Sequence, residues 1–385
     1  MKKIYLDNAA TTRVDPEVFK AMQPYFSDFY GNPSSVHSFG HEAKKALESA
    51  RLIAAGFINS DPQEIIFTGS GTESDNMAIK GIAFANHEKG NHIITSAIEH
   101  HAVLESCHSL EKSGFEVSYV PADPDGIVNL KELKKAIKKS TVLISVMHAN
   151  NEIGTIQPVS EIGQIARSNN IYFHIDAVQT FGHLKIDVED IGADLLSASA
   201  HKLYGPKGVG LIYVRRGTKI NPLINGGSQE NNMRASTQNV PGIVGFGKAI
   251  ELASRNMEKE AILQTKLRDR LIDGVIATID RSYLNGDRFK RLPNNASFSF
   301  DFIEGEGILL GLDMKGIAAS SGSACSSGSM EPSHVLKSIG MANQLARGSV
   351  RFSLGRFNTR EEIAYTLEVL VEIIDKLRKI SPLTK

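Results

Sequence analysis

Cysteine is scarce in this chain: its 385 residues include only two, Cys107 and Cys325. Two cysteines cannot form a disulfide framework, and their separation matches no CxxC pair. Neither sign of charge is in excess, because 43 basic residues balance 43 acidic ones. A chain without a basic surplus lacks the electrostatic signature of proteins that bind nucleic acid or an anionic membrane surface. We therefore expect neither nucleic acid nor a membrane as a partner.

Long hydrophobic runs are also absent. No apolar stretch approaches the roughly 18–20 residues that a membrane-spanning helix requires. The N-terminus carries two lysines, but its apolar stretch ends at Asp7, so we do not expect a signal peptide. Hydrophobic residues make up 41% of the chain and charged residues 22%, close to the averages of globular proteins. These features favour a soluble cytoplasmic enzyme, with a binding protein as the alternative.

Short apolar runs alternate with helical patterns through the first two-thirds of the chain. Continuous apolar runs separated by helices are typical of buried parallel strands with crossover connections. The sequence therefore predicts an α/β fold with a mostly parallel sheet of the seven-stranded type, flanked by helices. The predicted strands are 65–68, 92–95, 117–120, 141–147, 171–175, 194–199 and 209–214.

The pattern changes after Pro241. Two predicted helices, 242–257 and 258–279, are followed by shorter strands at 295–300 and 349–353. The last helix has Asn358 and Thr359 as candidate N-caps, with glutamates three residues on, as in a capping box. We predict a large domain, 14–255, and a smaller α+β domain, 256–385, on which the segment 1–13 packs.

Asp176 and Lys202 follow predicted strands. Ligands of open α/β sheets bind beyond the carboxyl ends of the strands. Asp176 either faces a protonated ring nitrogen or caps the next helix through Val178 or Gln179. Lys202 suits a Schiff base, whose amine must lose its proton, and its alternative is a solvated surface lysine. Lys207, five residues further on, is the competing lysine.

The segment Gly69-Ser70-Gly71-Thr72-Glu73 joins a predicted strand to a helix. Glycines let backbone N–H groups approach an anion closely, and a helix N-terminus attracts phosphate. The segment lacks the GxxxxGK[ST] pattern of nucleoside-triphosphate loops, and Ser70 with Glu73 also matches a plain capping box. On this motif alone, phosphate binding and simple capping remain equal alternatives.

His100 and His101 lie beyond the strand predicted at 92–95, with Cys107 and His108 downstream. Zinc sites use paired ligands at close spacing, and no second pair of ligands is found here, so we predict no metal site. His100 suits a ring stacked on a cofactor or a general acid–base role, and a core histidine is the alternative. Cys107 is interpreted as a packing residue on a helix.

Two further polar side chains are candidates for ligand binding. Asn151 follows the predicted strand 141–147 and either contacts a ligand or satisfies turn backbone. Arg351 lies in an apolar strand, where a guanidinium suggests a bidentate clamp on a carboxylate. An edge-strand arginine facing solvent is the alternative.

Cys325 lies within Ser-Ser-Gly-Ser-Ala-Cys-Ser-Ser-Gly-Ser, residues 320–329. A buried structural cysteine normally has apolar neighbours, because free cysteine behaves as a small hydrophobe. The small and polar residues around Cys325 are instead typical of a flexible, exposed loop. Cys325 is therefore either incidental or a thiol that must reach another group.

Four motifs occur together: Asn-Asn-Glu-Ile-Gly, His-Ile-Asp-Ala-Val-Gln, Ser-Ala-His-Lys and Ser-Gly-Ser-Ala-Cys-Ser-Ser-Gly. With these motifs the chain resembles the cysteine desulfurases of the NifS/IscS type, which are class V aminotransferases of the fold-type I pyridoxal phosphate group. The resemblance extends from Tyr-Leu-Asp-Asn-Ala-Ala-Thr-Thr at residues 5–12 to Arg-Phe-Ser-Leu-Gly-Arg at 351–356 and covers essentially the whole chain. The segment 229–237 differs, with Asn-Asn and Ala-Ser where glycines are common.

The resemblance implies that the large domain, 14–255, binds pyridoxal 5'-phosphate. Lys202 would hold the cofactor. Asp176 would keep the ring nitrogen of the cofactor protonated and so make the ring an electron sink. His100 would stack on the ring, and Gln179 would bond its phenolic oxygen. The residues implied to hold the phosphate are Gly71, Thr72, Ser199 and His201, together with Thr237 of the second subunit of a homodimer.

The resemblance also implies the reaction. Arg351 would clamp the carboxylate of L-cysteine, and Asn151 would contact the cofactor or the substrate. Lys202 would remove the α-proton, and Cys325 would take the sulfur as a persulfide and release L-alanine. The sulfur would then pass to an iron–sulfur scaffold or another sulfur-acceptor protein.

Other functions on the same scaffold stay open at this point. A class V aminotransferase has no need of a mobile thiol, so Cys325 argues against simple transamination. A selenocysteine lyase uses a substrate that differs by one atom and is harder to distinguish. A sulfur carrier without turnover would have no use for Lys202.

Overall fold

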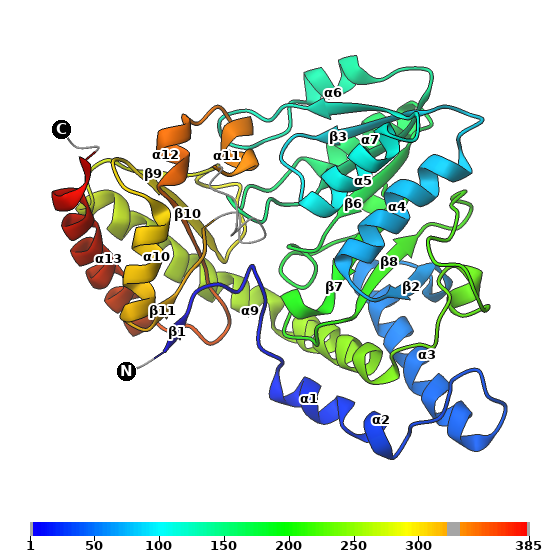
Figure 1. Ribbon diagram of the computed structural model, residues 1–385. Helices are drawn as coiled ribbons and strands as arrows, with labels where there is room; N and C mark the ends of the chain where they lie inside the picture. Colours follow the sequence, from blue (N-terminus) through cyan, green and yellow to red (C-terminus); the bar gives the residue numbers. More distant parts are fainter. Residues whose placement is uncertain (1–2, 322–331, 383–385) are drawn as a thin grey trace.

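The computed structural model describes residues 3–321 and 332–382. Within this part of the chain the strands form sheets of seven, three and two strands. The two larger sheets have separate hydrophobic cores, and Figure 1 shows them as two lobes connected along one side by a long helix. None of the helices in the described part combines the length and the apolar character needed to cross a membrane.

The large lobe is built on the seven-stranded sheet. Its strands are β2 (Ile65–Thr68), β3 (His92–Ser96), β4 (Glu116–Val120), β5 (Thr141–Met147), β6 (Tyr172–Asp176), β7 (Leu195–Ser199) and β8 (Gly210–Val214). They lie in the order β2-β8-β7-β6-β5-β3-β4. Only the pairs that involve β8 are antiparallel. The seven predicted strands and the mostly parallel sheet are therefore confirmed.

Helices cover both faces of this sheet, because neighbouring side chains of a buried strand point to opposite faces. Phe67 of β2 belongs to the hydrophobic cluster that includes side chains of α3 (Ser38–Ile58) and α7 (Val159–Ser168). Its neighbour Ile66 belongs to the cluster that includes α4 (Gly71–Ala85) and α5 (His101–Glu111). Cys107 of α5 is fully buried in the second cluster, which confirms its packing role. The shorter helices of this lobe are α1 (Pro16–Met22), α2 (Pro24–Ser27), α6 (Leu130–Ala136) and α8 (Val188–Ile191).

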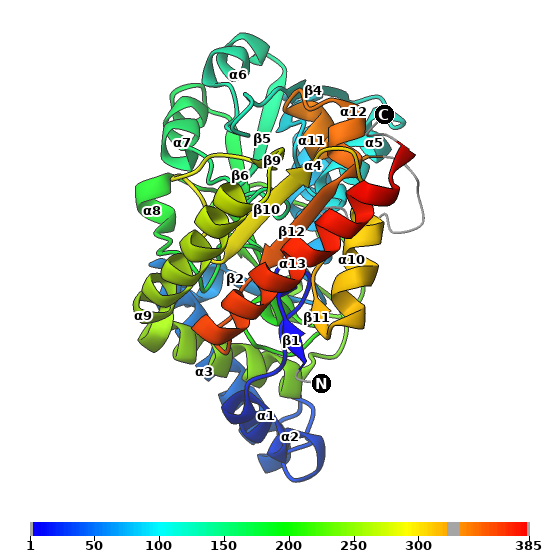
Figure 2. The same cartoon turned by 90° about the vertical axis from the view of Figure 1, so that its left-hand side faces the viewer.

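The small lobe contains the antiparallel sheet β12-β10-β9, formed by β9 (Ser282–Leu284), β10 (Asn295–Phe300) and β12 (Ser349–Ser353). Helix α13 (Arg360–Ile380) begins with the predicted capping box between Thr359 and Glu362. Figure 2 shows α13 and the end of α9 lying across one face of β10 and β12. The other helices of the lobe are α10 (Gly305–Met314), α11 (His334–Ser338) and α12 (Asn343–Arg347).

The N-terminal segment joins the small lobe before it enters the large one. Strand β1 (Ile4–Tyr5) pairs in parallel with β11 (Ile317–Ala318). Ile4 and Leu6 are buried in the core of the small lobe. Beyond them the segment reaches the large lobe, where Thr12 bonds to the backbone of His201.

Helix α9 (Val240–Thr278) connects the lobes as one 39-residue helix. The prediction of two helices meeting at residues 257 and 258 was therefore wrong. The first part of α9 packs in the large core and the last part in the small core, and the stretch between them is mostly exposed. This change of buried face interrupts the hydrophobic period without any glycine or proline that would end a helix. The predicted domain boundary at 255 falls inside this helix.

Candidate active site

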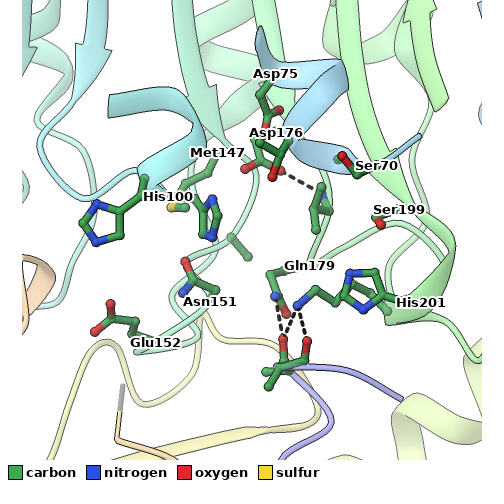
Figure 3. Close-up of a pocket in the computed structure, with 18 of the residues that line it drawn as sticks. Ser70, Asp75, His100, Met147, Asn151, Glu152, Asp176, Gln179, Ser199 and His201 are labelled. Carbon is green, nitrogen blue, oxygen red and sulfur yellow. Dashed lines mark hydrogen bonds between the residues drawn. The ribbon is translucent and has the colours of Figure 1, made fainter. Parts of the chain in front are cut away.

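A cavity of about 330 Å³ lies at the carboxyl ends of the parallel strands (Figure 3). Met147 ends β5, Asp176 ends β6 and Ser199 ends β7, and all three line the cavity. Parallel neighbours end at the same edge of a sheet, so side chains distant in the sequence meet there. The volume is in the range of small-molecule sites, which is roughly 300–1,000 Å³.

The first turn of α4 forms one side of the cavity. Its N-cap is Ser70, whose Oγ accepts a hydrogen bond of 3.1 Å from the N–H of Glu73. The carboxylate of Glu73 accepts from Gly69 N–H at 2.8 Å and from Arg234 Nε at 2.7 Å. The return bond of a capping box is therefore made to Gly69 and not to Ser70.

Gly71 and Thr72, at the start of α4, line the cavity together with Ser199 and His201. Figure 3 shows Ser70, Ser199 and His201 on the same side. A Cβ atom on Gly71 would lie 2.6 Å from Cγ2 of Val178, so no other residue fits there without a shift. Exposed N–H groups at a helix N-terminus with nearby hydroxyl and imidazole groups form an anion site of the kind that binds phosphate.

Lys202 ends the short 3₁₀ helix η2 (Ala200–Lys202) that follows β7. Its Nζ donates hydrogen bonds to the carbonyl oxygens of Ala9, at 2.6 Å, and Ala10, at 2.8 Å. Gln179 Nε2 also donates to the Ala9 oxygen, at 3.1 Å (Figure 3). The N-terminal segment thus forms one wall of the cavity and positions the amine of Lys202 within it.

Two carboxyl groups lie side by side at the top of the cavity in Figure 3. Asp176 is 6% exposed and its Oδ1 accepts from Val178 N–H at 2.9 Å, which is the capping contact expected from the sequence. Asp75 of α4 is 1% exposed, and its Oδ1 has no hydrogen-bond partner among the described residues. Burial raises the pKa of both carboxyl groups, and the charge of Asp176 raises the pKa of Asp75 further. Lys202 favours the charged form of Asp176, so Asp176 is the ionised member of the pair.

His100 is the N-cap of α5, and its Nδ1 accepts a hydrogen bond of 3.1 Å from Ala102 N–H. Burial, and then the charges of Lys202, His101 and His334, lower the pKa of His100 to about 4. The imidazole is therefore neutral near pH 7, with Nδ1 as the acceptor and the proton on Nε2.

Arg351 of β12 reaches the cavity from the small lobe. Its Nη1 donates to the carbonyl oxygen of Asn151 at 2.8 Å, and its Nη2 donates to Asp7 Oδ1 at 2.9 Å. Its side chain is 3% exposed, and its Nε has no hydrogen-bond partner among the described residues. A buried guanidinium with a spare donor is suited to a carboxylate ligand, and the solvent-facing alternative is excluded.

The comparisons with known proteins agree along the whole chain. Residues 4–365 match the family model described as aminotransferase class-V. The cysteine desulfurase IscS of Dictyoglomus turgidum is 59% identical over 381 residues, which span 99% of this chain and 97% of that protein. The chain belongs to the class-V aminotransferase family, among its cysteine desulfurases.

Solved structures of the family have the same fold. A "NIFS-LIKE PROTEIN" superposes with a TM-score of 0.92 at 41% identity, covering 98% of this chain and 100% of that one. A structure described as "SspA in complex with cysteine" has a TM-score of 0.82 at 37% identity and covers 93% of this chain and 100% of that one. The α/β fold predicted for this desulfurase-family chain is thereby confirmed.

Most of the site residues that were predicted from the sequence line this cavity. Those that line it are Gly71, Thr72, His100, Asn151, Asp176, Gln179, Ser199, His201, Lys202 and Arg351. The competing lysine, Lys207, is exposed and is not among the described residues that line the cavity. Thr237 is also exposed and is likewise not in the described lining of its own chain's cavity. Cys325 lies outside the described residues.

Several cavity residues of this family member were missed by the sequence analysis. Asp75 is four residues after Gly71 and therefore lies on the same face of α4, so helical spacing alone could have predicted its place in the cavity. Glu152 follows Asn151 directly, and its carboxyl bonds to Ser333 Oγ at 2.5 Å. His334 packs its ring 4.8 Å from that of His101 across the lobes, a contact without any local signal.

Proposed function

We propose that the protein is a pyridoxal 5'-phosphate-dependent cysteine desulfurase, which converts L-cysteine to L-alanine and transfers the sulfur to Cys325 as a persulfide. The observation that carries this proposal is the convergence of an amine, an anionic carboxylate and an anion-binding helix N-terminus in one cavity. Lys202, Asp176 and Gly71 provide these groups from three separate elements. The names of the relatives, cysteine desulfurase IscS and a complex with cysteine, support the same substrate.

The residues present fit the cofactor. Lys202 holds it covalently, and the carboxylate of Asp176 bonds to its ring nitrogen. A side chain at position 71 would meet Val178, so Gly71 keeps the start of α4 open and lets its backbone N–H groups bind the phosphate. The remaining contacts that we assign are stacking by His100, a hydrogen bond from Gln179 to the phenolic oxygen, and phosphate bonds from Thr72, Ser199 and His201. When bound, pyridoxal phosphate withdraws electrons from the substrate's Cα and so acidifies the Cα–H bond.

The side chains of this protein handle the substrate and its protons. Arg351 binds the carboxylate of L-cysteine through its spare donors, and Asn151 lies beside it. The amine of Lys202 accepts the α-proton and later returns a proton to the product. His100 is neutral because its pKa is lowered to about 4, so it presents an uncharged ring that can stack on the cofactor.

Cys325 is the sulfur acceptor. Its thiolate attacks Sγ of the substrate, the new S–S bond forms, and the Sγ–Cβ bond breaks. The electron pair of that bond stays on the product carbon, which takes up a proton to give L-alanine. One cysteine and one thiol thus become one alanine and one persulfide, without any external oxidant or reductant.

The proposed assembly is a homodimer in the cytoplasm. The exposed position of Thr237, away from its own chain's cavity, supports a role at the phosphate of the second subunit. An acceptor protein, such as an iron–sulfur scaffold, then takes the sulfur from Cys325.

Mass spectrometry of the peptide that contains Cys325 tests this function. After brief incubation of the purified holoenzyme with L-cysteine and no reductant, we expect a mass increase of one sulfur atom on Cys325 and none on buried Cys107. The variant C325A should bind the cofactor and fail to deliver sulfur, whereas C107A should form the persulfide. Alanine release with an unmodified Cys325 would point to a lyase instead.

A further inference from the structure

The N-terminal segment and strand β12 hold a buried ion pair against the cavity wall. Asp7 and Ser353 form a parallel bridge, and the Ser353 N–H donates to Leu6 O at 2.7 Å. Arg351 precedes Ser353 by two residues and therefore lies on the same face of β12. This register places the Asp7 carboxylate 2.9 Å from Nη2 of Arg351.

The two members of the pair differ in their access to the cavity. Arg351 is among the described residues that line it, and Asp7 is not. Arg351 is 3% exposed and Asp7 is 19% exposed. A ligand carboxylate that reaches Arg351 from the cavity thus meets a guanidinium that is already paired with the carboxylate of Asp7.

Glu152, the other acid close to Arg351, is bonded to Ser333. Burial raises the pKa of Glu152, which favours its neutral form. Asp7 therefore supplies the anion that faces Arg351 directly in this part of the structure.

The position of Asp7 is also linked to Lys202. Only one residue, Asn8, separates Asp7 from Ala9, whose carbonyl oxygen accepts from Lys202 Nζ and Gln179 Nε2. The N–H of Ala10 donates to the carbonyl oxygen of Asp7 at 3.1 Å, which closes a tight turn between the two contacts. The same short segment therefore fixes both the carboxylate clamp and the amine.

We propose that Asp7 is a positioning residue that holds the plane of the Arg351 guanidinium and weakens its attraction for a substrate or product carboxylate, so that the amino acid product is released. The proposal rests on the proposed function, in which Arg351 binds the α-carboxylate. With Asp7 ionised, the triad of Asp7, Arg351 and ligand carboxylate has a net charge of −1. Without the charge of Asp7 the triad is neutral, and a buried carboxylate binds more tightly.

Calorimetric titration of the holoenzyme with propionate tests this charge effect. Propionate presents the carboxylate and has no amino group to react with the cofactor. We expect D7N to bind propionate about three- to tenfold more tightly than the unmodified protein. The substitution removes the charge of Asp7, which repels the ligand carboxylate and competes with it for Arg351, and partly exposed charge pairs change affinity by about this factor. L-alanine, the product, should show the same change. Unchanged or weaker binding by D7N would overturn the proposal.

The matched control is D15N. Asp15, the N-cap of α1, also pairs with an arginine, Arg356, at 2.9 Å, and neither residue is among the described residues that line the cavity. The propionate affinity of D15N should stay within about twofold of that of the unmodified protein, since Asp15 pairs with an arginine that does not line the cavity. A D15N effect equal to that of D7N would show a general charge effect and sink the proposal.

Two further variants separate this proposal from the proposed function. D7E keeps the charge, so it should bind propionate as the unmodified protein does, and tightening in D7E equal to D7N would contradict a charge mechanism. R351A should lose propionate binding. Retained binding in R351A would overturn the Arg351 clamp and the Asp7 proposal with it, whereas lost binding together with no tightening in D7N would overturn the Asp7 proposal alone.

Discussion

The carboxylate of Glu230 forms a bidentate ion pair with Arg51, with 2.8 Å to Nη1 and 2.9 Å to Nη2. Their side chains are 1% and 6% exposed, and Glu230 Oε2 also accepts from the N–H of Phe67 in β2. Glu230, Asn231 and Asn232 have φ angles of 45°, 56° and 64°, in the left-handed region. The ion pair therefore anchors the strained turn 230–232 to the large core. This turn begins seven residues before Thr237.

Removing one partner of this pair should be costly. We expect E230A to lower the free energy of unfolding by about 3–5 kcal/mol, because it leaves the Arg51 charge buried without its partner. Urea denaturation of the purified protein measures this. The control is E48A, which removes the other carboxylate of Arg51, 48% exposed and 3.3 Å from Nε. E48A should cost less than about 1 kcal/mol. Equal costs for both variants would contradict the buried anchor.

Gly71 should be essential for cofactor affinity. Its substitution by alanine places Cβ 2.6 Å from Cγ2 of Val178, so this stiff β-branched side chain, which lines the cavity, must shift. We expect G71A to weaken pyridoxal phosphate binding by about tenfold or more, which corresponds to about 1.4 kcal/mol. Fluorescence titration of the apoprotein with the cofactor measures the dissociation constant.

Gly56 is the matched control for this substitution. It lies on α3 and has no heavy atom within 4 Å of its ideal Cβ. G56A should leave cofactor affinity unchanged and stabilise the helix by about 0.5–1 kcal/mol. Loss of cofactor affinity in G56A would mean that G71A acts through general destabilisation.

Lys202 should be the residue that carries the cofactor. We expect borohydride reduction of the holoenzyme to label Lys202 permanently, because a reduced Schiff base cannot hydrolyse. K202A should remain unlabelled and lose desulfurase activity, whereas K207A, changed at an exposed lysine, should be labelled and active. Peptide mass mapping identifies the labelled position. A label on Lys207 would mean that Lys207, and not Lys202, carries the cofactor.

Glu99 makes the stability of the apoprotein dependent on pH. Its Oε1 accepts from Ser96 Oγ at 2.5 Å and from Met147 N–H at 3.0 Å, and burial raises its pKa to about 8. A carboxyl whose pKa is raised on folding stabilises the fold fully at low pH, and this contribution is lost as the pH rises through the folded-state pKa. Between pH 5.5 and 8 the protein should lose roughly 2–3 kcal/mol of unfolding free energy relative to E99Q.

The measurement is urea denaturation of both proteins without cofactor across this pH range. Glutamine mimics the protonated carboxyl and does not titrate, so the E99Q curve lacks the loss due to residue 99. E105Q, changed at a carboxylate that is 70% exposed, should follow the unmodified protein. Parallel pH curves for E99Q and the unmodified protein would contradict a buried titrating Glu99.

The strand positions could be predicted because burial on both faces produces continuous apolar runs. Thr141–Met147 was predicted to the residue, since every side chain of β5 is buried. Asp176 and Lys202 could be selected because polar groups directly after such runs lie at the ligand-binding edge of a parallel sheet. Asp75 could also have been predicted, because it lies four residues after Gly71 and so on the same face of the helix. Glu152 could not, because its burial depends on a hydrogen bond to Ser333, which is far away in the sequence.

The elements and the chemical groups at their ends follow from local patterns, because hydrophobic period, capping and glycine placement act over a few residues. The continuation of α9 from one core into the other depends on long-range packing, since the break in its pattern marks a change of packing partner and not the end of a helix. Likewise, the contact between Asp7 and Arg351 joins residues 344 positions apart. No local pattern encodes such a distance, because it is set by how the two lobes and the N-terminal segment pack around the cavity.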